Sequence, residues 1–401
     1  MANELTYLFS PEAVRHSSIK MYKHAMNGNT NFIVDESLLN EAAKFVTSLI
    51  RENHPDLNIP YHSRWRHFEV PGVTLLDKLK EGFLDYTSQQ KAETGVDLIV
   101  ASVLLDAGAG PKWKYTDPEN GVRVGRSEGL GLASLNMFMN GGFSSSKSNP
   151  LIVDTEALSQ ITPDALAAYF QVSSDNPLVG LNGRVGLLNS LGAAMLAKPE
   201  MFPNQRPGDL VSYLQRQHGN TIKAKEVLAG VILGFGDIWP GRTVLHDKNL
   251  GDVWQYAPFG EGIESLVSLH KLSQWLTYSI IETLQNSGFT ITQLDDLTGL
   301  AEYRNGGLLV DTGVLKLRNQ SKASELHKPS SELIIEWRAL TIYLLDLLAD
   351  IIRKELGKTS EELPLVKILE GGTWLAGRRI AQTLRDGATA PILLDSDGTV
   401  F

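Results

Sequence analysis

The segment from Asp295 to Asp311 restricts how this chain can fold more than any other part of the sequence. It places Glu302, Tyr303 and Arg304 side by side among leucine, alanine and glycine residues. A buried carboxylate or guanidinium must be paired, hydrogen-bonded or shifted in pKa, because an isolated buried charge destabilises the fold. A glycine pair follows, where a backbone or a ligand can approach closely. We therefore predict that this segment forms a wall of an active site.

Helical geometry allows two interpretations of the segment. In a helix, Asp295 and Glu302 would lie two turns apart on one face, and so would Arg304 and Asp311. The functional interpretation is a carboxylate held in an apolar pocket, where it acts as nucleophile, general base or stabiliser of a cationic transition state. The alternative is a structural pair of arginine and carboxylate that ties two helices together. The residues alone leave both interpretations open.

The composition is that of a globular protein in a reducing compartment. Of the 401 residues, 42% are hydrophobic, 21% are charged and none is cysteine, which excludes disulfides, thiolate nucleophiles and cysteine metal sites. The longest apolar runs are too short to span a bilayer and the N-terminus lacks a secretory pattern, so we expect a cytoplasmic protein without membrane partners. A net charge of −9 argues against nucleic-acid binding but allows a local basic pocket for one phosphate.

Apolar periodicity predicts a mainly α fold with a few short strands. The helical pattern covers residues 37–52, 155–170, 184–197, 222–235, 265–286 and 331–355. Residues 96–108 are ambiguous between a strand and a buried helix, and the tail 391–401 could pair at a sheet edge. The loop at 140–150 is the best candidate for a hinge. It separates a predicted N-terminal helical portion, 1–145, from a helical core, 146–401, packed together as one unit.

Two further clusters combine charges with aromatic side chains. Residues 234–256 contain Asp237, Trp239, Arg242, His246, Asp247, Lys248, Asp252 and Trp254. This mixture suits a small polar ligand such as a sugar phosphate, whereas the alternative is a surface turn with one or two ion pairs. In residues 59–70, Arg64 and His67 interleave with aromatic residues, which either clamp an anion or only anchor a loop.

Other site signatures are weak. Residues 124–138 could begin a helix with Ser127 as its cap and free N–H groups for an anion, although a plain cap is commoner. The nine histidines are scattered, and only His62 and His67 lie near metal-ligand spacing. The sequence contains no phosphate-binding lysine loop, nucleophile elbow or dinucleotide fingerprint.

Motifs along nearly the whole chain identify a family. The sequence contains, in order, PYHSRWRHFE, LLDAGAG, GRSEG, NPLVGLNGR, HKLSQWLTYS, LTGLAEYRNGGLLVD, SELIIEWRALT, LEGGTWLAGRRIA and SDGTVF. Together they resemble the uracil-catabolism family of fungi and bacteria, long treated as a domain of unknown function. The resemblance implies a pathway that converts uracil to its ribonucleotide, opens the ring and leaves a ureido-ribose phosphate.

A more distant resemblance implies the chemistry. The order of ITPDALAAYFQ, VLHDKNLGDVW and LDDLTGLAEYR is similar to that in the queuosine salvage family. Those proteins are queuosine 5′-phosphate N-glycosidases with a helical fold similar to the helix-hairpin-helix DNA glycosylases. By this match Lys248 takes the place of the family's lysine, and Asp252 that of the carboxylate before the tryptophan. Glu302 falls where the family has its catalytic aspartate, which moves the carboxylate by one methylene group.

The two resemblances together predict an N-ribosyl hydrolase for a small 5′-phosphorylated ribosyl compound, with ribosylurea 5-phosphate cleaved to urea and ribose 5-phosphate. Cleavage passes through an oxocarbenium-like transition state that a carboxylate beneath the sugar stabilises, and it requires no metal or organic cofactor. The predicted catalytic residues are Glu302, Asp311 and Asp295. The predicted substrate-binding residues are Lys248, Arg304, His246, Asp252, Tyr303, Trp239, Trp254, Asp237, Arg338, Arg64 and His67. We also predict that residues 61–68 close over the pocket that contains Glu302.

Two other functions stay open at this point. A metal-dependent amidohydrolase acting on a uracil-derived ureide would call for a metal cluster or an activated serine or cysteine. A non-catalytic nucleotide-binding protein would keep the pocket and would retain its ligand affinity without Glu302.

Overall fold

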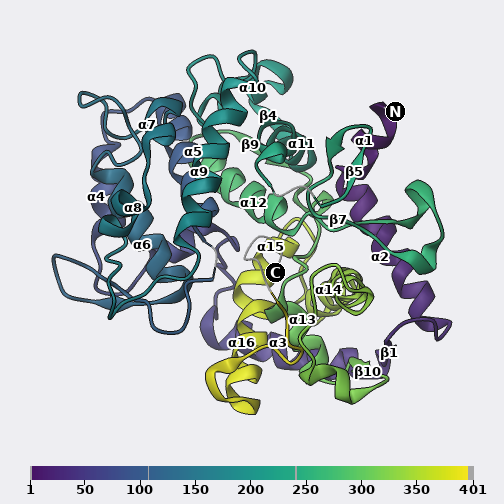
Figure 1. Ribbon diagram of the computed structural model, residues 1–401. Coiled ribbons are helices and arrows are strands. Elements are labelled where there is room, and N and C mark those ends of the chain that lie inside the picture. The colour runs from purple at the N-terminus through teal and green to yellow at the C-terminus, as the bar shows by residue number, and fades with distance from the viewer. Residues whose placement is uncertain (1, 107, 240–241, 396–401) are drawn as a thin grey trace. The chain divides into compact units, whose positions relative to one another are not determined.

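The structure is a computed structural model that describes residues 2–106, 108–239 and 242–395 (Figure 1). Helices make up most of its regular structure, and the described strands are only two or three residues long. The predicted mainly α fold is thereby confirmed. Among the described residues, no helix is both long enough and apolar enough to cross a membrane.

The chain forms two compact units, each assembled from separate stretches of sequence. The first unit comprises Met1–His62, Gly241–Gln274 and Gln293–Phe401, and the second comprises Ser63–Pro240 and Trp275–Thr292. The predicted boundary after residue 145 falls inside the second unit, so the two units do not coincide with the portions 1–145 and 146–401. Helix α12 (Lys271–Asn286) contributes residues to both units.

The first unit combines helices with short antiparallel strand pairs. Its helices are α1 (Ala2–Leu8), α2 (Pro11–Met26), α3 (Leu39–Asn53), α13 (Tyr303–Asp311), α14 (Glu332–Leu356), α15 (Leu365–Ile368) and α16 (Trp374–Leu384). Its strand pairs are β1 (Phe32–Val34) with β10 (Leu315–Leu317), β5 (Val244–Leu245) with β6 (Lys248–Asn249), and β7 (Val253–Gln255) with β8 (Leu266–Ser268). In the tail that was predicted to pair at a sheet edge, Leu394 forms a parallel bridge with His327, and residues 396–401 lie outside the described residues.

Helix α14 is the centre of the first unit. Its sequence is apolar on most sides, as expected for a helix surrounded by protein, and it packs against α2 and α3. Ser331 precedes it in an extended conformation, and Gly357 follows it with a φ of 65°, in the left-handed region that glycine adopts at little cost. The predicted helix at 331–355 is thus confirmed to within one residue at each end.

Helix α13 approaches both α14 and α16 closely through glycine (Figure 1). A Cβ atom at Gly377 of α16 would clash with the carbonyl oxygen of Arg304, and one at Gly306 would lie 2.8 Å from Trp337 Nε1. That indole nitrogen donates a hydrogen bond to the Gly306 carbonyl oxygen at 3.0 Å. The glycine pair was predicted to allow close approach of a backbone or a ligand. At Gly306 the group that approaches is the Trp337 side chain of helix α14.

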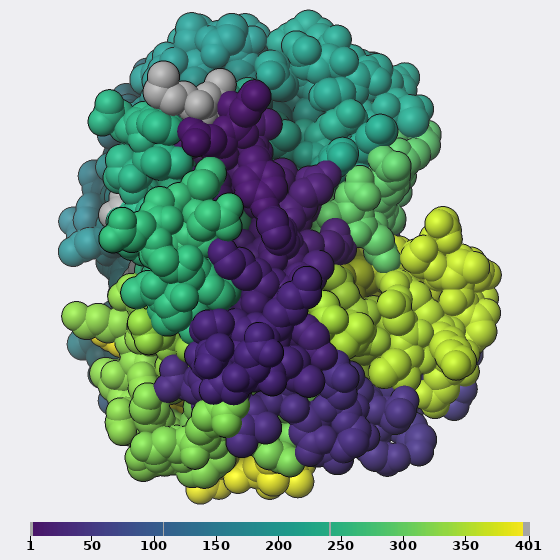
Figure 2. Space-filling view, turned by 90° about the vertical axis from the view of Figure 1, so that its right-hand side faces the viewer, coloured from purple at the N-terminus to yellow at the C-terminus, as the bar shows by residue number. Residues whose placement is uncertain are grey.

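The N-terminal helices α1 and α2 lie along one face of the first unit. Figure 2 shows them in purple beside the green segment that contains β5 to β8. Ser17 of α2 accepts a hydrogen bond from the Ser268 backbone N–H at 3.2 Å, and Lys20 forms an ion pair with Glu264 at 3.1 Å. These contacts fix the β7–β8 pair, which carries Asp252 at its start.

The second unit is also helical. Its helices are α4 (Leu75–Gly82), α5 (Ser88–Leu104), α6 (Arg126–Met139), α7 (Thr155–Gln160), α8 (Pro163–Tyr169), α9 (Leu181–Leu196), α10 (Asp209–His218) and α11 (Ala224–Phe235). Its strand pairs are β2 (Tyr115–Thr116) with β3 (Arg123–Val124), antiparallel, and β4 (Thr221–Lys223) with β9 (Thr290–Thr292), parallel.

Three predicted elements of the second unit and its junction are refined by the structure. In the ambiguous run 96–108, residues 96–104 belong to helix α5, which Thr87 and Gln90 start with a reciprocal capping box and which is buried along most of its length, while residue 107 lies outside the described residues. The predicted helix 155–170 is two helices, because Pro163 forces the residue before it out of the helical region. The predicted helix 265–286 begins only at Lys271, since residues 266–268 form strand β8.

Candidate active site

Glu302 begins helix α13 and is almost completely buried. It has an extended backbone with a φ of −121°, and its carboxylate accepts hydrogen bonds from the backbone N–H groups of Arg304 at 2.7 Å and Asn305 at 2.6 Å. Only 6% of its surface is exposed. The carboxylate therefore caps the helix and meets its positive dipole end.

Burial makes this carboxylate easier to protonate than an exposed one. Removal from water raises the pKa of Glu302, and this outweighs the opposing effects of the two backbone hydrogen bonds and of the positive charges of Lys271 and His62. In the part of the chain that the structure describes, no cation forms an ion pair with Glu302. A buried carboxylate with a raised pKa and nearby cations suits proton transfer and stabilisation of positive charge.

His62 acts on Glu302 through its charge and is held by a second glutamate. Its Nδ1 atom is 2.7 Å from Glu370 Oε2, and its ring centroid is 5.8 Å from that of Trp374. The imidazole is 7% exposed. Among the described residues, Nε2 of His62 makes no hydrogen bond. A carboxylate on Nδ1 fixes the tautomer and leaves Nε2 available for proton transfer.

An unusual helical turn brings Glu370 to this place. Residues Leu369–Thr373 form a π-helical turn, a feature that occurs often at functional sites. At its end, Thr373 Oγ1 donates a hydrogen bond to Asn305 Oδ1 at 2.8 Å, in the first turn of α13. The His62 backbone N–H donates to the Val366 carbonyl oxygen at 3.1 Å. The π turn therefore joins His62 to the end of α13 that Glu302 caps.

A buried ion pair supports the site from behind. Asp252 accepts two hydrogen bonds from Arg338, at 2.7 and 2.8 Å, and further ones from Trp254 Nε1 at 2.7 Å and the Lys271 backbone N–H at 2.9 Å. Arg338 also donates to the carbonyl oxygen of Ala301, next to Glu302, at 3.2 Å. This network fixes the backbone at Lys271 and at the entry to α13.

The pKa of Asp252 is shifted in the opposite direction to that of Glu302. Burial alone would raise it, but the Arg338 charge and hydrogen bonds, together with those from Trp254 and Lys271, outweigh burial and lower the pKa of Asp252. Asp252, Arg338 and Trp254, predicted to bind substrate, are thus bonded to one another, with Asp252 ionised at the centre.

The two other predicted catalytic carboxylates lie elsewhere in the first unit. Asp311 ends helix α13, about 13 Å along the helix axis from Glu302, and forms a two-pronged ion pair with Arg385 at 2.7 and 2.6 Å. Asp295 lies in a 3₁₀ turn and pairs with Arg353, while it accepts a hydrogen bond from the Leu365 backbone N–H at 2.7 Å. The structure does not bring either carboxylate to the cap of α13.

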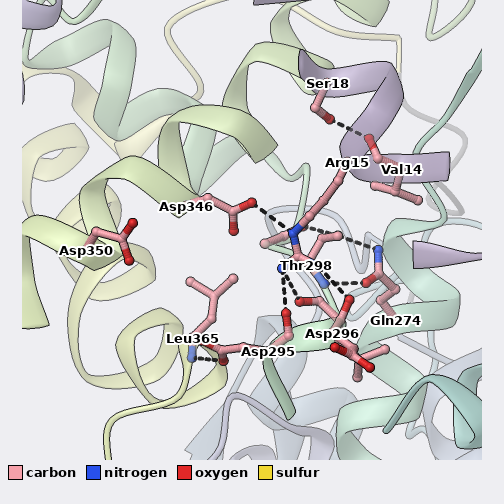
Figure 3. A network of polar contacts seen from close by, with 12 residues as sticks. Val14, Arg15, Ser18, Gln274, Asp295, Asp296, Thr298, Asp346, Asp350 and Leu365 are labelled. Carbon is pink, nitrogen blue, oxygen red and sulfur yellow. Dashed lines mark hydrogen bonds and ion pairs between the residues drawn. The ribbon is translucent and has the colours of Figure 1, made fainter. Parts of the chain in front are cut away.

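The segment 295–311 is therefore not one helix, which corrects the helical alignment of Asp295 with Glu302. Figure 3 shows how Arg15 of α2 holds the turn instead. Its guanidinium donates to the carbonyl oxygens of Asp295, Asp296 and Leu297 at 2.6 to 2.8 Å and pairs with Asp346 at 3.1 Å. Each of the three hydrogen bonds to a carbonyl oxygen replaces a bond that a continuous helix would have made internally.

The hairpin β5–β6 displays two predicted substrate-binding residues on the surface. His246 and Asp247 have φ values of 50° and 59°, the positive values that a tight two-residue hairpin turn requires. His246 bonds to Glu4 at 3.0 Å, and Lys248 is exposed. The lysine whose charge acts on Glu302 is Lys271, not Lys248.

The remaining predicted substrate-binding residues divide between the two units. In the first unit, the Arg304 guanidinium donates to the Ala388 carbonyl oxygen at 2.7 Å and lies 4.7 Å from the centroid of the half-buried Tyr303 ring. In the second unit Trp239 is buried and Asp237 pairs with Lys198 at 2.8 Å.

Arg64 and His67 lie together in the second unit. Arg64 is fully buried, pairs with Asp106 at 3.0 Å, and its Nη1 atom lies 3.1 Å from His67 Nδ1. It also donates to the Ser127 carbonyl oxygen at 3.3 Å. Helix α6 is capped by Gly125, whose backbone is extended, so the prediction that Ser127 caps it is wrong.

Two other features of the described residues bear on ligand binding. A cavity of about 390 Å³ beside α1 and α2 is lined by Tyr7, His16, Lys20 and Glu264, but these are already joined as the pairs Tyr7–His16 and Lys20–Glu264. Within the ranges that the structure describes, no three histidine, aspartate or glutamate side chains converge as metal ligands would.

The fold and the site define a mainly α protein whose first unit holds a buried helix-capping glutamate beside a histidine–glutamate pair. The chain belongs to the DUF1688 family, described as a protein of unknown function, which it matches over residues 7–401. It is 39% identical to Protein urg3 of Schizosaccharomyces pombe over 98% of both chains. It is 36% identical to Uracil catabolism protein 4 of Lachancea kluyveri, over 100% of this chain and 99% of that one. The predicted family is thereby confirmed.

Sequence reasoning did not select Lys271, His62 or Glu370 for this site. The signal was present, because these residues stand in HKLSQWLTYS, PYHSRWRHFE and LEGGTWLAGRRIA, three of the motifs that carried the family resemblance. His62 also belongs to the segment 61–68 that was predicted to close over Glu302.

Proposed function

We propose that this protein is an N-ribosyl hydrolase of uracil catabolism that cleaves ribosylurea 5-phosphate to urea and ribose 5-phosphate. The observation that carries the proposal is the buried Glu302 carboxylate, with its raised pKa, at the N-terminal end of α13. The name of Uracil catabolism protein 4, similar over its whole length, supports the pathway. The likeness to the helical N-glycosidases of queuosine salvage supports the reaction.

Cleavage of a ribosyl C1′–N bond develops positive charge on the sugar ring. A carboxylate near C1′ stabilises that charge, and the same group accepts a proton from the attacking water. Glu302 suits both roles because burial favours its protonated form, while the helix N-terminus and the charges of Lys271 and His62 favour its ionised form. Lys271 is our candidate for attracting the phosphate to the site.

Direct product analysis tests the proposal. The purified protein is incubated with ribosylurea 5-phosphate and, separately, with nucleoside 5′-monophosphates, in the presence and absence of a chelator, and released ribose 5-phosphate is measured. We expect release from ribosylurea 5-phosphate that resists the chelator and is abolished by Glu302→Gln. The absence of release from every ribosyl phosphate would overturn the proposal.

The same experiment distinguishes the two other functions. With ammonia measured in the same samples, ammonia release that the chelator abolishes, without release of ribose 5-phosphate, would indicate a metal-dependent amidohydrolase. Tight binding of a ribosyl phosphate without turnover, unchanged in Glu302→Gln, would indicate a nucleotide-binding protein.

A further inference from the structure

We propose that His62 is the general acid of this site, which protonates the departing nitrogen, and that Glu370 is its positioning residue. The inference rests on the proposed N-ribosyl hydrolase function and assigns the half of the reaction that Glu302 does not perform. It is carried by two contacts, Glu370 on Nδ1 of His62 and the π turn on the first turn of α13, and by an Nε2 atom that makes no hydrogen bond to any described residue.

The chemistry of the leaving group calls for such an acid. Urea is a poor leaving group as an anion, so cleavage of the C1′–N bond is slow unless the nitrogen receives a proton as the bond breaks. Glu302 cannot supply this help if it also receives the proton of the attacking water. Two groups with different roles are therefore required, as in glycosidases that use one residue as acid and another as base or nucleophile.

The Glu370 contact prepares His62 for this role. With its Nδ1–H donated to Glu370 Oε2 at 2.7 Å, protonated His62 keeps one donor, Nε2–H, for a ligand. Packing of the ring near Trp374, at 5.8 Å between centroids, limits its rotation.

A chain of hydrogen bonds within the first unit connects His62 to Glu302. The His62 backbone is tied to Val366 of α15, the π turn follows α15 directly, and Thr373 at its end is bonded to Asn305. Asn305 in turn donates its backbone N–H to the Glu302 carboxylate at 2.6 Å. Helix α16 continues from the π turn and packs along α13, so this chain of contacts is braced along its length.

Protonation of the departing nitrogen and attack of water together complete the cleavage. The C1′–N bond breaks, its electron pair stays on the urea nitrogen, and Nε2 of His62 gives that nitrogen a proton. Water adds its oxygen to C1′ and gives a proton to Glu302. Neutral urea and ribose 5-phosphate leave, and a proton returns from Glu302 to His62 through solvent. No oxidant, reductant or further reactant is consumed.

Leaving-group dependence tests the role of His62. His62→Gln and wild type are compared on ribosylurea 5-phosphate and on 4-nitrophenyl riboside 5-phosphate, whose leaving group departs without a proton. We expect His62→Gln to lower kcat for ribosylurea 5-phosphate by about 10²- to 10³-fold and for the nitrophenyl substrate by less than about threefold. Equal losses on both substrates would overturn the assignment, because a structural role does not distinguish leaving groups.

Two further measurements keep the result independent of folding. Glu370→Gln, which retains an oxygen for Nδ1, is expected to lower kcat for ribosylurea 5-phosphate about tenfold with little change in KM. On wild type alone, a solvent deuterium isotope effect is expected for ribosylurea 5-phosphate and not for the nitrophenyl substrate, and equal effects would contradict the proposal.

Failure of this inference is distinguishable from failure of the proposed function. Wild-type protein that cleaves neither substrate would remove the proposed function and the general acid with it. Cleavage of both substrates, with Glu302→Gln inactive on both and His62→Gln impaired equally on both, would keep the hydrolase and overturn only the role of His62.

Discussion

Two buried carboxylates of the first unit stand next to helix N-termini, yet their pKa values move in opposite directions. Asp252 bonds to the first backbone N–H of α12, and Glu302 bonds to two of the first N–H groups of α13. Asp252 also meets Arg338 at two points, and its pKa is lowered, whereas Glu302 meets no such partner among the described residues and its pKa is raised. This divergence separates a carboxylate that stays ionised from one that takes up a proton more readily.

The difference is between a scaffold and a reactive group. Asp252 spends its bonding capacity on Arg338, Trp254 and Lys271, so it holds α12 and the loop before α13 in place. Glu302 keeps a charge that burial disfavours. This charge destabilises the folded protein but is available for catalysis. Removal of each carboxylate should therefore affect different properties of the protein.

The largest expected effect is on catalysis by Glu302 variants. Glu302→Gln keeps an oxygen that caps α13 but removes the charge, and we expect it to lower kcat for ribosylurea 5-phosphate by about 10³-fold, equivalent to about 4 kcal/mol of transition-state stabilisation. Glu302→Asp, which restores the charge and shortens the side chain, should recover part of the activity. The measurement is steady-state release of ribose 5-phosphate.

A matched control for these variants is available in the same unit. Glu336 is also a buried glutamate whose pKa burial raises, but it accepts hydrogen bonds from the Asn31 backbone N–H and Tyr256, both at 2.7 Å. Glu336→Gln should leave kcat within about threefold of wild type, because the hydrogen-bond partners of Glu336 are not those of Glu302. An equal fall in kcat for both variants would show that loss of any buried charge, and not chemistry, explains the result.

The next largest effect is on stability at Asp252. Asp252→Asn leaves the buried Arg338 guanidinium without its counter-charge, and we expect the free energy of unfolding to fall by about 3–5 kcal/mol. Chemical denaturation measures this change. The double variant Asp252→Asn with Arg338→Met should lose less than the single one, because no unpaired charge remains. If the double variant lost more free energy of unfolding than the two single variants lose in sum, the pairing of Asp252 with Arg338 would be contradicted.

The pH dependence of stability should differ in sign between the two sites. The lowered pKa of Asp252 means that its contribution is present above 3.8 and is lost as pH falls through the folded-state pKa. The raised pKa of Glu302 means that its contribution is complete below 4.5 and is lost as pH rises through the folded-state pKa. We therefore expect Glu302→Gln to gain stability relative to wild type between pH 4.5 and neutrality.

Denaturation curves of wild type and both variants across pH 3 to 8 would measure this contrast. The destabilisation by Asp252→Asn should shrink in acid, while the difference between Glu302→Gln and wild type should vanish there. Parallel curves for Glu302→Gln and wild type at every pH would show that the pKa of Glu302 is unchanged on folding.

The local structure could be predicted from the sequence where a single stretch determines it. Helix α14 follows from its own apolar run and from the glycine at its end, and the burial of Glu302 follows from its apolar neighbours. The alignment of Asp295 with Glu302 failed because a 3₁₀ turn, held by Arg15 from α2, interrupts the segment. Periodicity contains no information about a partner that lies about 280 residues away.

The surroundings of Glu302 could not be predicted for the same reason. His62, Lys271 and Glu370 come from three distant stretches, and only the packing of α15, the π turn and α12 brings them near α13. The resemblance to queuosine salvage proteins supplied the carboxylate and pointed to Lys248 as its lysine. In the structure Lys248 is exposed on a hairpin, which makes the choice of lysine a question for experiment.

The smallest expected effect separates these two lysines. Lys271→Gln removes the cation whose charge lowers the pKa of Glu302, and we expect kcat/KM for ribosylurea 5-phosphate to fall about tenfold, as for loss of one charged contact to a phosphate. Lys248→Gln removes an exposed charge at a hairpin and should change kcat/KM by less than about twofold. The pH profile adds an independent readout, because the loss of Lys271 raises the pKa of Glu302 further and shifts the acidic limb of kcat/KM to higher pH. The opposite result would be a tenfold fall in kcat/KM for Lys248→Gln and an unchanged pH profile of kcat/KM for Lys271→Gln. It would show that Lys248 on the β5–β6 hairpin, and not Lys271 at the start of α12, binds the substrate.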